Sequence, residues 1–569
     1  MINKIPRRWT TVFFLTLIFL GASFLRFYRL GSNPPALSWD EAAWGYNAYS
    51  LGLTGADEFG RRWPLNYLES FGDFKPPVYA YLTILPVKIF GLNEFSARFA
   101  SAFFGALTVL LTYFLVRELF PSQPLGGGHS PTIRGVTYGY QLSVISSLLL
   151  AISPWHLQFS RVAFESNVGL FFDILTVWLI LKAFKKPWLL VLAAFSAGLS
   201  LYVYQAEKVF VPFLVLAIAL IWRKSLLKLP RKYLVLGLLV GAICLLPLVK
   251  MTLTTPEIFL RAKGTSLTAD QTPFLAWTAE KLARDYQDKD YLGLILDNRR
   301  VTYFLAFLRG YFSHFDLNWL FITGGEARHH APGIGVLYLW ELPFLVWGIY
   351  GLIFSRVGKK SKLLIFLWFL LAPIPAAFTT GAPHEVRTIR LLPIFQILVA
   401  FGLIRAWQIL NKKRLILQMM LIGAGGLFFI FNSAYYLNQY FVQQNYFNSQ
   451  SWQYGYQQAV EEIKKIEPQY QKIVVSNQPY LDQSYMFFLF YLKFDPATYQ
   501  QLGGTVSGGF AENHRGFGKY TFRPIAWEKE VVMADTLYVG RPGDFSGQVK
   551  ILKTIYFLDG QPAILIATK

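Results

Sequence analysis

The sequence predicts an α-helical protein that crosses a membrane many times and ends in a small α/β domain. Of its 569 residues, 54% are hydrophobic and only 15% are charged, whereas soluble domains carry about 25% charged residues. The apolar residues gather in runs long enough to cross a bilayer, which takes about 20 residues in a helix. The last part of the chain loses these runs and shows short β-rich segments instead. This composition excludes a disordered chain and a single soluble domain.

About eleven apolar runs are the predicted membrane-spanning helices. They centre near residues 11–28, 97–117, 138–154, 166–183, 187–205, 208–222, 233–251, 335–354, 362–378, 390–410 and 415–434. The stretch 187–222 is the least regular, because Gln205, Glu207 and Lys208 lie at its middle turn. Its halves are expected to form one hairpin or two tilted, shortened spans. The first run has the basic start of a signal peptide, but no small-residue cleavage site follows it, which favours a retained span.

The distribution of positive charge predicts the orientation of these spans. Lys and Arg number 54 against 33 Asp and Glu, a net charge of +21. Five basic groups fall on one side of the membrane if the spans alternate. They are Lys4, Arg7 and Arg8; Lys182, Lys185 and Lys186; Arg223, Lys224, Lys228, Arg231 and Lys232; Arg356, Lys359, Lys360 and Lys362; and Lys412, Lys413 and Arg414. Because basic loops stay in the cytoplasm, we expect an integral plasma or inner membrane protein with a cytoplasmic N-terminus. The excess charge then sets orientation and is not a footprint for nucleic acid.

The chain divides into a membrane domain, 1–434, and an extracytoplasmic α/β domain, 435–569. The membrane domain has two long outer loops, about 29–95 and 253–334, whereas its inner turns are short apart from a Gly/Pro/Ser-rich stretch around 121–135. The α/β domain is predicted from a helical segment, Glu461–Ile466, and four β-rich runs, Ile473–Ser476, Thr536–Val539, Val549–Phe557 and Ala563–Ala567. Only the outer side has enough chain to build a site, so we expect the chemistry there.

Two acidic residues open the first outer loop. Ser38 and Glu41 have the spacing of a capping box, and Asp40 would lie in the first turn of the helix, where its charge is favourable. In a second interpretation the cap is also present, and Asp40 takes part in catalysis as a base. A carboxylate flanked by Trp39 and Trp44 at a membrane edge is partly desolvated, which makes it basic enough to accept a proton from a hydroxyl group.

Lys75 lies later in the same loop, directly before Pro76-Pro77. The two prolines fix the backbone, and they bias the lysine toward an extended conformation. The segment is then either a rigid connection into an interfacial helix or a device that holds an ammonium group at the depth of the lipid phosphates.

Two further outer turns carry charges. Arg161 and Glu165 are four residues apart and would share one face of a helix. Such an ion pair adds little stability on a protein surface. Between two apolar spans, however, charged residues are energetically costly and are usually functional. Arg387 and Arg390, three apart at the mouth of a span, would either snorkel to the interface or bind an anionic headgroup.

Several reaction classes find no support. His314, His329 and His330 lie near acidic residues, but adjacent histidines seldom face one ion and no HExxH motif is present, so the sequence predicts no protein-built metal site. The single cysteine, Cys244, excludes an internal disulfide and a cysteine-based zinc site. The sequence has no Walker, GxGxxG or GxSxG motif, which leaves a nucleotide-driven pump and a serine hydrolase unsupported.

Together these motifs resemble the GT-C superfamily of membrane glycosyltransferases. The likeness is to glycosyltransferase family 39, the polyprenyl- or dolichyl-phosphate-mannose protein mannosyltransferases, and the lipid A aminoarabinose transferases have a similar plan. The resembling segments are Asp40-Glu41, Lys75-Pro76-Pro77, Asn93–Phe99 leading into Phe103–Leu111, Ser153–His156 with Arg161 and Glu165, and Pro383–Arg390. The resemblance is sharp over about 37–120 and 153–172. The tail departs from eukaryotic members, which leaves the acceptor open.

The resemblance implies an enzyme that moves a sugar from a polyprenyl-monophosphate donor to a protein, lipid or glycan acceptor on the outer face, with inversion at the anomeric carbon. By analogy Asp40 is the general base, while Glu41 and Glu165 position the acceptor or a developing positive charge. The leaving phosphate needs nearby cations. The implied phosphate contacts are Lys75, Arg387 and Arg390, and the implied acceptor or sugar contacts are Arg161, His329, His330 and His384.

The expected partners are the donor lipid, the bilayer and the acceptor, without nucleic acid. No cofactor is implied with certainty. A divalent metal is neither required nor excluded, because a monophosphate donor calls for Mg²⁺ less than a nucleotide diphosphate does.

Two other functions compete with the transferase. A transporter or flippase of a lipid-linked glycan would use Asp173 and Glu341, which lie inside apolar runs. Transporters place their sites near the midplane, whereas the conspicuous charged motifs here lie at the outer edge. A third interpretation is a non-catalytic assembly protein whose tail recruits a partner.

Overall fold

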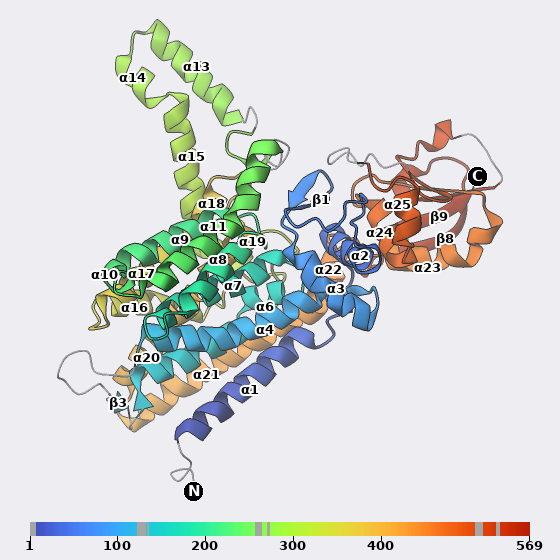
Figure 1. Cartoon of the computed structure of the whole chain (residues 1–569). Coiled ribbons are helices and arrows are strands. Elements are labelled where there is room, and N and C mark those ends of the chain that lie inside the picture. Colours follow the sequence, from blue (N-terminus) through green and yellow to red (C-terminus); the bar gives the residue numbers. More distant parts are fainter. Residues whose placement is uncertain are drawn as a thin grey trace.

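Long helices run side by side from the N-terminal end of the chain toward a smaller domain that contains the C-terminus (Figure 1). The computed structural model describes residues 7–121, 132–133, 136–255, 264–269, 273–506, 516–530 and 535–568.

Each of the eleven predicted apolar runs contains a helix. These are α1 (Arg7–Phe27), α4 (Glu94–Leu119), α5 (Tyr138–Ile152), α7 (Glu165–Ala183), α8 (Leu189–Ser200), α9 (Glu207–Ile221), α11 (Arg231–Thr254), α16 (Glu341–Ile353), α17 (Lys359–Leu371), α20 (Ile394–Leu410) and α21 (Leu415–Asn438). Short helices α10 (Arg223–Leu226) and α18 (Ile374–Ala377) accompany them.

Not all of these helices are long enough to cross a bilayer alone. Within the described residues, six helices are long and apolar enough, and two bent pairs raise the number to eight. One pair is α5 with α6 (Pro154–Ser160), and the other is α19 (Glu385–Thr388) and η4 (Ile389–Leu391) with α20. Helices α8, α9 and α16 have only 12, 15 and 13 residues. At 1.5 Å per residue each is shorter than the hydrocarbon core of about 30 Å, as expected for the stretch 187–222 but not for α16.

Close helix packing in the bundle depends on glycine. A Cβ atom on Gly348 of α16 would lie 1.9 Å from the carbonyl oxygen of Leu398 in α20, and one on Gly402 would lie 2.0 Å from that of Phe344. Small residues bring helix backbones together where lipid provides no hydrophobic driving force between helices. The two glycines therefore hold α16 and α20 in direct contact.

Three of the five predicted basic turns, those that contain Lys182, Arg223 and Lys360, lie together at one end of the bundle, and Lys4 of the first group lies outside the described residues. Lys182 and Lys185 lie 2.6 and 3.1 Å from the carboxylate oxygens of Glu118 at the end of α4. The hydroxyl of Ser361 in α17 donates to the carbonyl of Leu119. The C-terminal domain lies at the opposite end (Figure 1). Of the predicted inner stretch around 121–135, residues 122–131 and 134–135 lie outside the described residues, and β3 (Thr132–Ile133) pairs with β4 (Val136–Thr137).

The two outer loops differ in how they relate to the bundle. The first contains α2 (Trp39–Thr54), the antiparallel pair β1 (Leu68–Ser70) and β2 (Asp73–Lys75), and α3 (Val78–Phe90). The second contains α13 (Pro273–Gln287), α14 (Tyr291–Leu296) and α15 (Arg299–Ser313), which project away from the bundle (Figure 1), followed by the π-helix η3 (Trp319–Thr323).

The C-terminal domain is a five-stranded mixed sheet with helices. The strand order is β6-β5-β7-β9-β8, in which β5 is parallel to both neighbours and β9 is antiparallel to both of its own. The strands are β5 (Lys472–Val475), β6 (Tyr520–Phe522), β7 (Thr536–Gly540), β8 (Lys550–Tyr556) and β9 (Pro562–Thr568). The helical elements are η5 (Gln439–Gln443), α22 (Gln444–Asn448), α23 (Tyr456–Ile466), η6 (Glu467–Gln469), α24 (Ser484–Leu492), α25 (Pro496–Gln501), η8 (Trp527–Lys529) and η9 (Pro542–Asp544). The four predicted strands and the predicted helix are confirmed, and the three-residue strand β6 was missed.

This domain shares a hydrophobic core with the first outer loop. Ala42 and Tyr46 of α2 pack in the same buried cluster as Phe487 of α24. A Cβ atom on Gly45 would lie 2.5 Å from the ring of Phe490. Helix α2 is therefore held from the C-terminal side as well as by the bundle.

A buried carboxyl group links α2 to the C-terminal domain through hydrogen bonds. Glu58, which follows α2, accepts hydrogen bonds from Asn47 at 2.9 Å, Tyr485 at 3.2 Å and Thr505 at 2.7 Å. Burial raises the pKa of Glu58 to about 7. Its protonation state is thus linked to the contact between α2 and the C-terminal domain.

Candidate active site

An accessible carboxylate opens the first outer helix and pairs with a buried lysine. The ammonium group of Lys75 donates to Oδ1 of Asp40, whose side chain is 43% exposed while that of Lys75 is 8% exposed. Strand β2 holds Lys75 extended, as the following prolines predicted, and its register places Lys75 opposite Leu68. The ammonium lies 5.4 Å from the ring centroid of Trp44 and 5.2 Å from that of Phe71. The lysine side chain is therefore buried and fixed, and Asp40 is the solvent-accessible partner of the pair.

Glu41, the next residue, faces the interior. Its carboxylate accepts the backbone N–H groups of Ser38 at 3.0 Å and Ala163 at 3.1 Å, and the Arg98 guanidinium lies 2.8 Å from Oε1. The predicted cap at Ser38 is thus present. At 1% exposure, with its oxygens already bonded inside the protein, Glu41 has no open oxygen for an acceptor. The structure favours a positioning role in which Glu41 locks α2 to α4 and to the turn before α7.

Arg161 and Glu165 do not share a helix face, and that prediction was wrong. Helix α6 ends at Ser160, and α7 begins only at Glu165. Arg161 is fully buried and donates to the carbonyls of Leu25, Arg26 and Asn33 and to the hydroxyl of Tyr440. It closes the C-terminal end of α1, where carbonyl groups lack helical partners. Direct contact between Arg161 and an acceptor does not fit this burial.

Glu165 lies at the start of α7 and is partly exposed. Glu165 and Glu41 are both electrostatic neighbours of Tyr79. The ring of Tyr79 lies 5.5 Å from that of Trp44, which in turn faces Lys75. Glu165 is therefore in the same region as the Asp40–Lys75 pair, as the predicted site requires.

The two outer arginines are in different environments. Arg390 is fully buried and donates to Glu207 of α9 at 2.8 Å. Asp173 lies beside Glu207 and accepts from the hydroxyl of Ser200. Arg390 therefore balances acids inside the bundle, and direct contact with a donor phosphate does not fit its placement. Arg387 is partly exposed, donates to Thr379 and Thr380, and faces a cavity.

That cavity, of about 420 Å³, lies next to strand β2 and combines cations with apolar side chains. Its lining includes Phe74, Tyr204, Gln205, Lys208, Met251 and Arg387. Lys208 donates to the side chain of Gln205 at 2.7 Å, and Gln205 donates to the carbonyl of Phe74 at 2.6 Å. Lys208 was not among the predicted site residues. The sequence offered one indication of it: Gln205, Glu207 and Lys208 interrupt the apolar stretch 187–222.

A second cavity, of about 450 Å³, is lined by Trp39 together with Glu326, Arg328, Gln453, Tyr480 and Asp482. The backbone N–H of Trp39 donates to Gln453 at 3.1 Å, and the Arg328 guanidinium lies 4.7 Å from a Trp39 ring centroid. Trp39 and Phe74, which precede Asp40 and Lys75 in the sequence, therefore line different cavities. Gln453, Tyr480 and Asp482 of the C-terminal domain form part of the wall of this second cavity.

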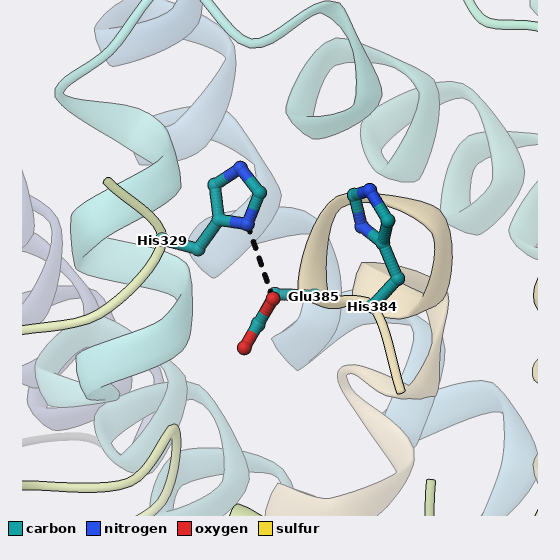
Figure 2. A group of neighbouring side chains, drawn as sticks. All are labelled: His329, His384 and Glu385. Carbon is teal, nitrogen blue, oxygen red and sulfur yellow. Dashed lines mark hydrogen bonds and ion pairs between the residues drawn. The ribbon is translucent and has the colours of Figure 1, made fainter. Parts of the chain in front are cut away.

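The structure separates the predicted histidines. His329 and His384 face one another across Glu385 (Figure 2), and Nδ1 of His329 lies 3.1 Å from the Glu385 carboxylate. His330 instead turns its ring nitrogens toward the carbonyls of Gly325 and Ala331. It therefore stabilises its own loop.

His314 positions the neighbouring segment. Its Nδ1 lies 2.7 Å from the carbonyl of Gly310, and its Nε2 accepts the backbone N–H of His384 at 3.2 Å. Burial lowers the pKa of His314 to about 4, so the ring is neutral near pH 7. A neutral ring donates through one nitrogen and accepts through the other, as these two contacts require.

The acids that a transporter would need have structural partners. Glu341 accepts the backbone N–H of Tyr338 at 3.1 Å at the start of α16. Asp173 belongs to the buried group with Glu207 and Arg390 described above. The Asp173 carboxyl therefore links α7 to α8, and the Glu341 carboxyl caps the start of α16.

Comparison with known proteins matches the N-terminal part of the chain. Residues 16–126 fit the model of the dolichyl-phosphate-mannose-protein mannosyltransferase family, a range that includes Asp40, Lys75 and Arg98. An uncharacterised protein of Aquifex aeolicus is 30% identical over 128 residues, which is 22% of each chain. YkcB of Bacillus subtilis, whose name describes a mannosyltransferase, is 28% identical over 144 residues, which is 25% of this chain and 18% of YkcB. The matched segments thus span about a fifth of these relatives.

Solved structures extend the likeness to the whole chain. ArnT of Cupriavidus metallidurans bound to undecaprenyl phosphate superposes with a TM-score of 0.54 and 13% sequence identity over 99% of this chain and 98% of ArnT. The chain therefore has the fold of ArnT. The apo form of ArnT gives a TM-score of 0.50 over 98% of this chain and 97% of ArnT, again at 13% identity. The GT-C resemblance of the sequence and the predicted class of a polytopic membrane protein with a small C-terminal α/β domain are confirmed.

Proposed function

We propose that this GT-C protein transfers a sugar from a polyprenyl-monophosphate donor to an acceptor at the outer face of the membrane. The observation that carries the proposal is the Asp40–Lys75 pair, an accessible carboxylate held by a fixed ammonium group, whose sequence neighbours Trp39 and Phe74 line two different cavities. The positive-inside distribution of basic turns supports an extracytoplasmic site.

The donor cavity is the one lined by Lys208 and Arg387. Two cationic side chains suit the phosphodiester of the donor and the phosphate monoester that leaves, and the apolar side chains of α11, among them Leu248 and Met251, suit a polyprenyl chain. Lys75, the neighbour of Phe74, is directed at Asp40 instead, because successive side chains of a strand point to opposite faces. Positive charge at the phosphate stabilises the leaving group as its bond to the sugar breaks.

The acceptor enters from the cavity lined by Trp39. Asp40 takes the proton of the acceptor hydroxyl, and the freed oxygen electron pair forms a bond to the anomeric carbon. The bond from that carbon to the phosphate oxygen breaks, and the polyprenyl phosphate leaves with the electron pair. Attack from the face opposite the phosphate inverts the anomeric centre. Glu165, partly exposed beside this region, positions the acceptor or the developing positive charge on the sugar.

The test is transfer by the purified chain in lipid nanodiscs. Polyprenyl-monophosphate donors that carry different sugars are each supplied with protein, lipid and glycan acceptors. Release of polyprenyl phosphate is measured together with the mass gained by the acceptor. The proposal expects equimolar release and transfer with at least one donor, and little with a polyprenyl-diphosphate-linked sugar. Absence of transfer in nanodiscs, together with movement of an intact lipid-linked glycan across the bilayer of sealed proteoliposomes, would instead identify a flippase and overturn the proposal.

A further inference from the structure

Three side chains outside the proposed reaction centre converge on one space. His384 and Glu385 come from the start of the bent pair that leads into α20, and His329 comes from the loop between η3 and α16 (Figure 2). One potential ligand atom from each lies within 4.8 Å of the others. The cluster therefore joins two segments that are far apart in the sequence.

The donor set suits a transition metal. Two imidazoles and one carboxylate are a common set for Zn²⁺, which binds them at about 2.0–2.2 Å and so holds its ligand atoms about 3.4 Å apart in a tetrahedral site. The distance of 3.1 Å between Nδ1 of His329 and Glu385 is already close to that value. Small rotations of side chains would bring the widest separation, 4.8 Å, into range. Three protein ligands leave a fourth position for water.

The surrounding contacts resemble those that orient metal ligands. Trp319 donates its indole N–H to the second oxygen of Glu385 at 3.0 Å. Nε2 of His329, the nitrogen that does not face Glu385, lies 3.9 Å from the carboxylate of Glu326. An outer carboxylate of this kind favours the tautomer in which the inner nitrogen is free to bind metal. The rings of Phe159 and Phe164 pack against His329.

We propose that His329, His384 and Glu385 bind a divalent metal ion, with Zn²⁺ the ion that best matches the ligands. The ion would tie the loop around residues 326–330 to the segment that carries Arg387. Arg328 of that loop covers Trp39 in one cavity, and Arg387 lines the other. The metal would thus hold the walls of both cavities in one arrangement, at a site separate from the Asp40–Lys75 pair.

The sequence did not predict this site because its ligands lie in separate outer loops. The adjacent pair His329-His330 argued against a shared ion, and the structure turns His330 away from the cluster. His384, like His329, was predicted only as an acceptor or sugar contact, and Glu385 only as part of the basic turn.

The test uses the full chain in detergent, stripped with a chelator and then titrated with Zn²⁺ against a chromophoric competitor. We expect one equivalent to bind, and the melting temperature to rise with it, since an ion that binds only the folded state stabilises that state. Single replacements His329→Gln and His384→Gln should each weaken binding at least 10-fold and abolish the rise. Visible absorption of Co²⁺ bound in place of Zn²⁺ reports the coordination directly.

Matched variants locate the ion. His330→Gln removes the neighbouring histidine and Asp40→Asn removes the exposed acid of the reaction centre, and both should keep the equivalent of Zn²⁺. Replacing Glu385 also removes the Trp319 acceptor, so His384→Gln, at the more open edge, is the decisive variant. Absence of stoichiometric binding by wild type would overturn the proposal, as would binding that survives His384→Gln or disappears in Asp40→Asn. These readouts need no transfer activity, so the metal proposal and the proposed function can fail separately.

Discussion

Two neighbouring carboxylates, Asp40 and Glu41, should respond in opposite ways to loss of charge. Glu41→Gln is expected to destabilise the protein, whereas Asp40→Asn should leave it folded. The reason is the environment of each group. Glu41 is 1% exposed and Arg98 is 0% exposed, whereas the Asp40 side chain is 43% exposed.

The cost of Glu41→Gln follows from its hydrogen bonds. Ser38, Ala163 and Arg98 all direct N–H donors at the two oxygens. An amide in either orientation turns its own NH₂ group toward one of these donors and leaves the Arg98 charge buried without a counter-charge. Removing one partner of a buried ion pair costs about 3–5 kcal/mol.

Thermal unfolding measures this cost. Unfolding entropy is about 2.1 cal/mol/K per residue, so for this chain the loss corresponds to a fall in Tm on the order of 3 °C. The assay compares Tm for wild type, Glu41→Gln and Asp40→Asn in the same detergent, and then measures transfer at a temperature where all three are folded. We expect Glu41→Gln to keep most of its transfer rate there. A wild-type Tm for Glu41→Gln together with loss of transfer equal to that of Asp40→Asn would refute the assignment of Glu41 to positioning.

Three further predictions follow from the cavities and from the contact between α2 and the C-terminal domain. Lys208→Met and Arg387→Met should each raise the donor KM about 10- to 100-fold in a transfer assay, the value of one charged hydrogen bond of about 1.5–3 kcal/mol; an unchanged donor KM in both would remove the donor cavity from the account. Because the pKa of Glu58 rises to about 7 on folding from 4.5, the folded state binds more protons between these values, so stability should fall as pH rises from about 4.5 to 7 and then level off. Glu58→Gln should flatten that fall in Tm measured across the same range, and an identical profile in the variant would exclude Glu58 as its source. Gly45→Val should push the ring of Phe490 aside and expose the C-terminal domain to limited proteolysis, an outcome checked against Gly425→Val, which introduces a side chain where nothing lies within 4 Å.

The spans and the outer motifs could be read from the sequence because each depends on local pattern. Runs of apolar residues, the Ser38–Glu41 spacing and the two prolines after Lys75 all act within a few residues. The structure accordingly has a helix in each run, a capped α2 and an extended Lys75. Span length was less predictable, since the start of α16 depends both on the local bond between Tyr338 and Glu341 and on a tertiary bond from the Tyr338 hydroxyl to the carbonyl of Ile152.

The roles of charged residues depended on distant partners that the sequence does not show. Glu41 faces Arg98, and Arg390 faces Glu207. Arg161 binds carbonyls at the end of α1 because a turn, not a continuous helix, separates it from Glu165. Sequence spacing predicted which charges lie at the outer end, but only the fold distinguished the buried ones from Asp40.

The most direct measurement for the central claim is the single-turnover transfer rate of Asp40→Asn at saturating donor, with donor binding measured in the same preparation. Asp316→Asn, which replaces another exposed outer acid, is the matched control. General-base catalysis contributes about 10²- to 10⁴-fold, so the account predicts a fall of at least 100-fold for Asp40→Asn, donor affinity within a few-fold of wild type, and an unchanged rate for Asp316→Asn. A wild-type transfer rate in Asp40→Asn would contradict the account.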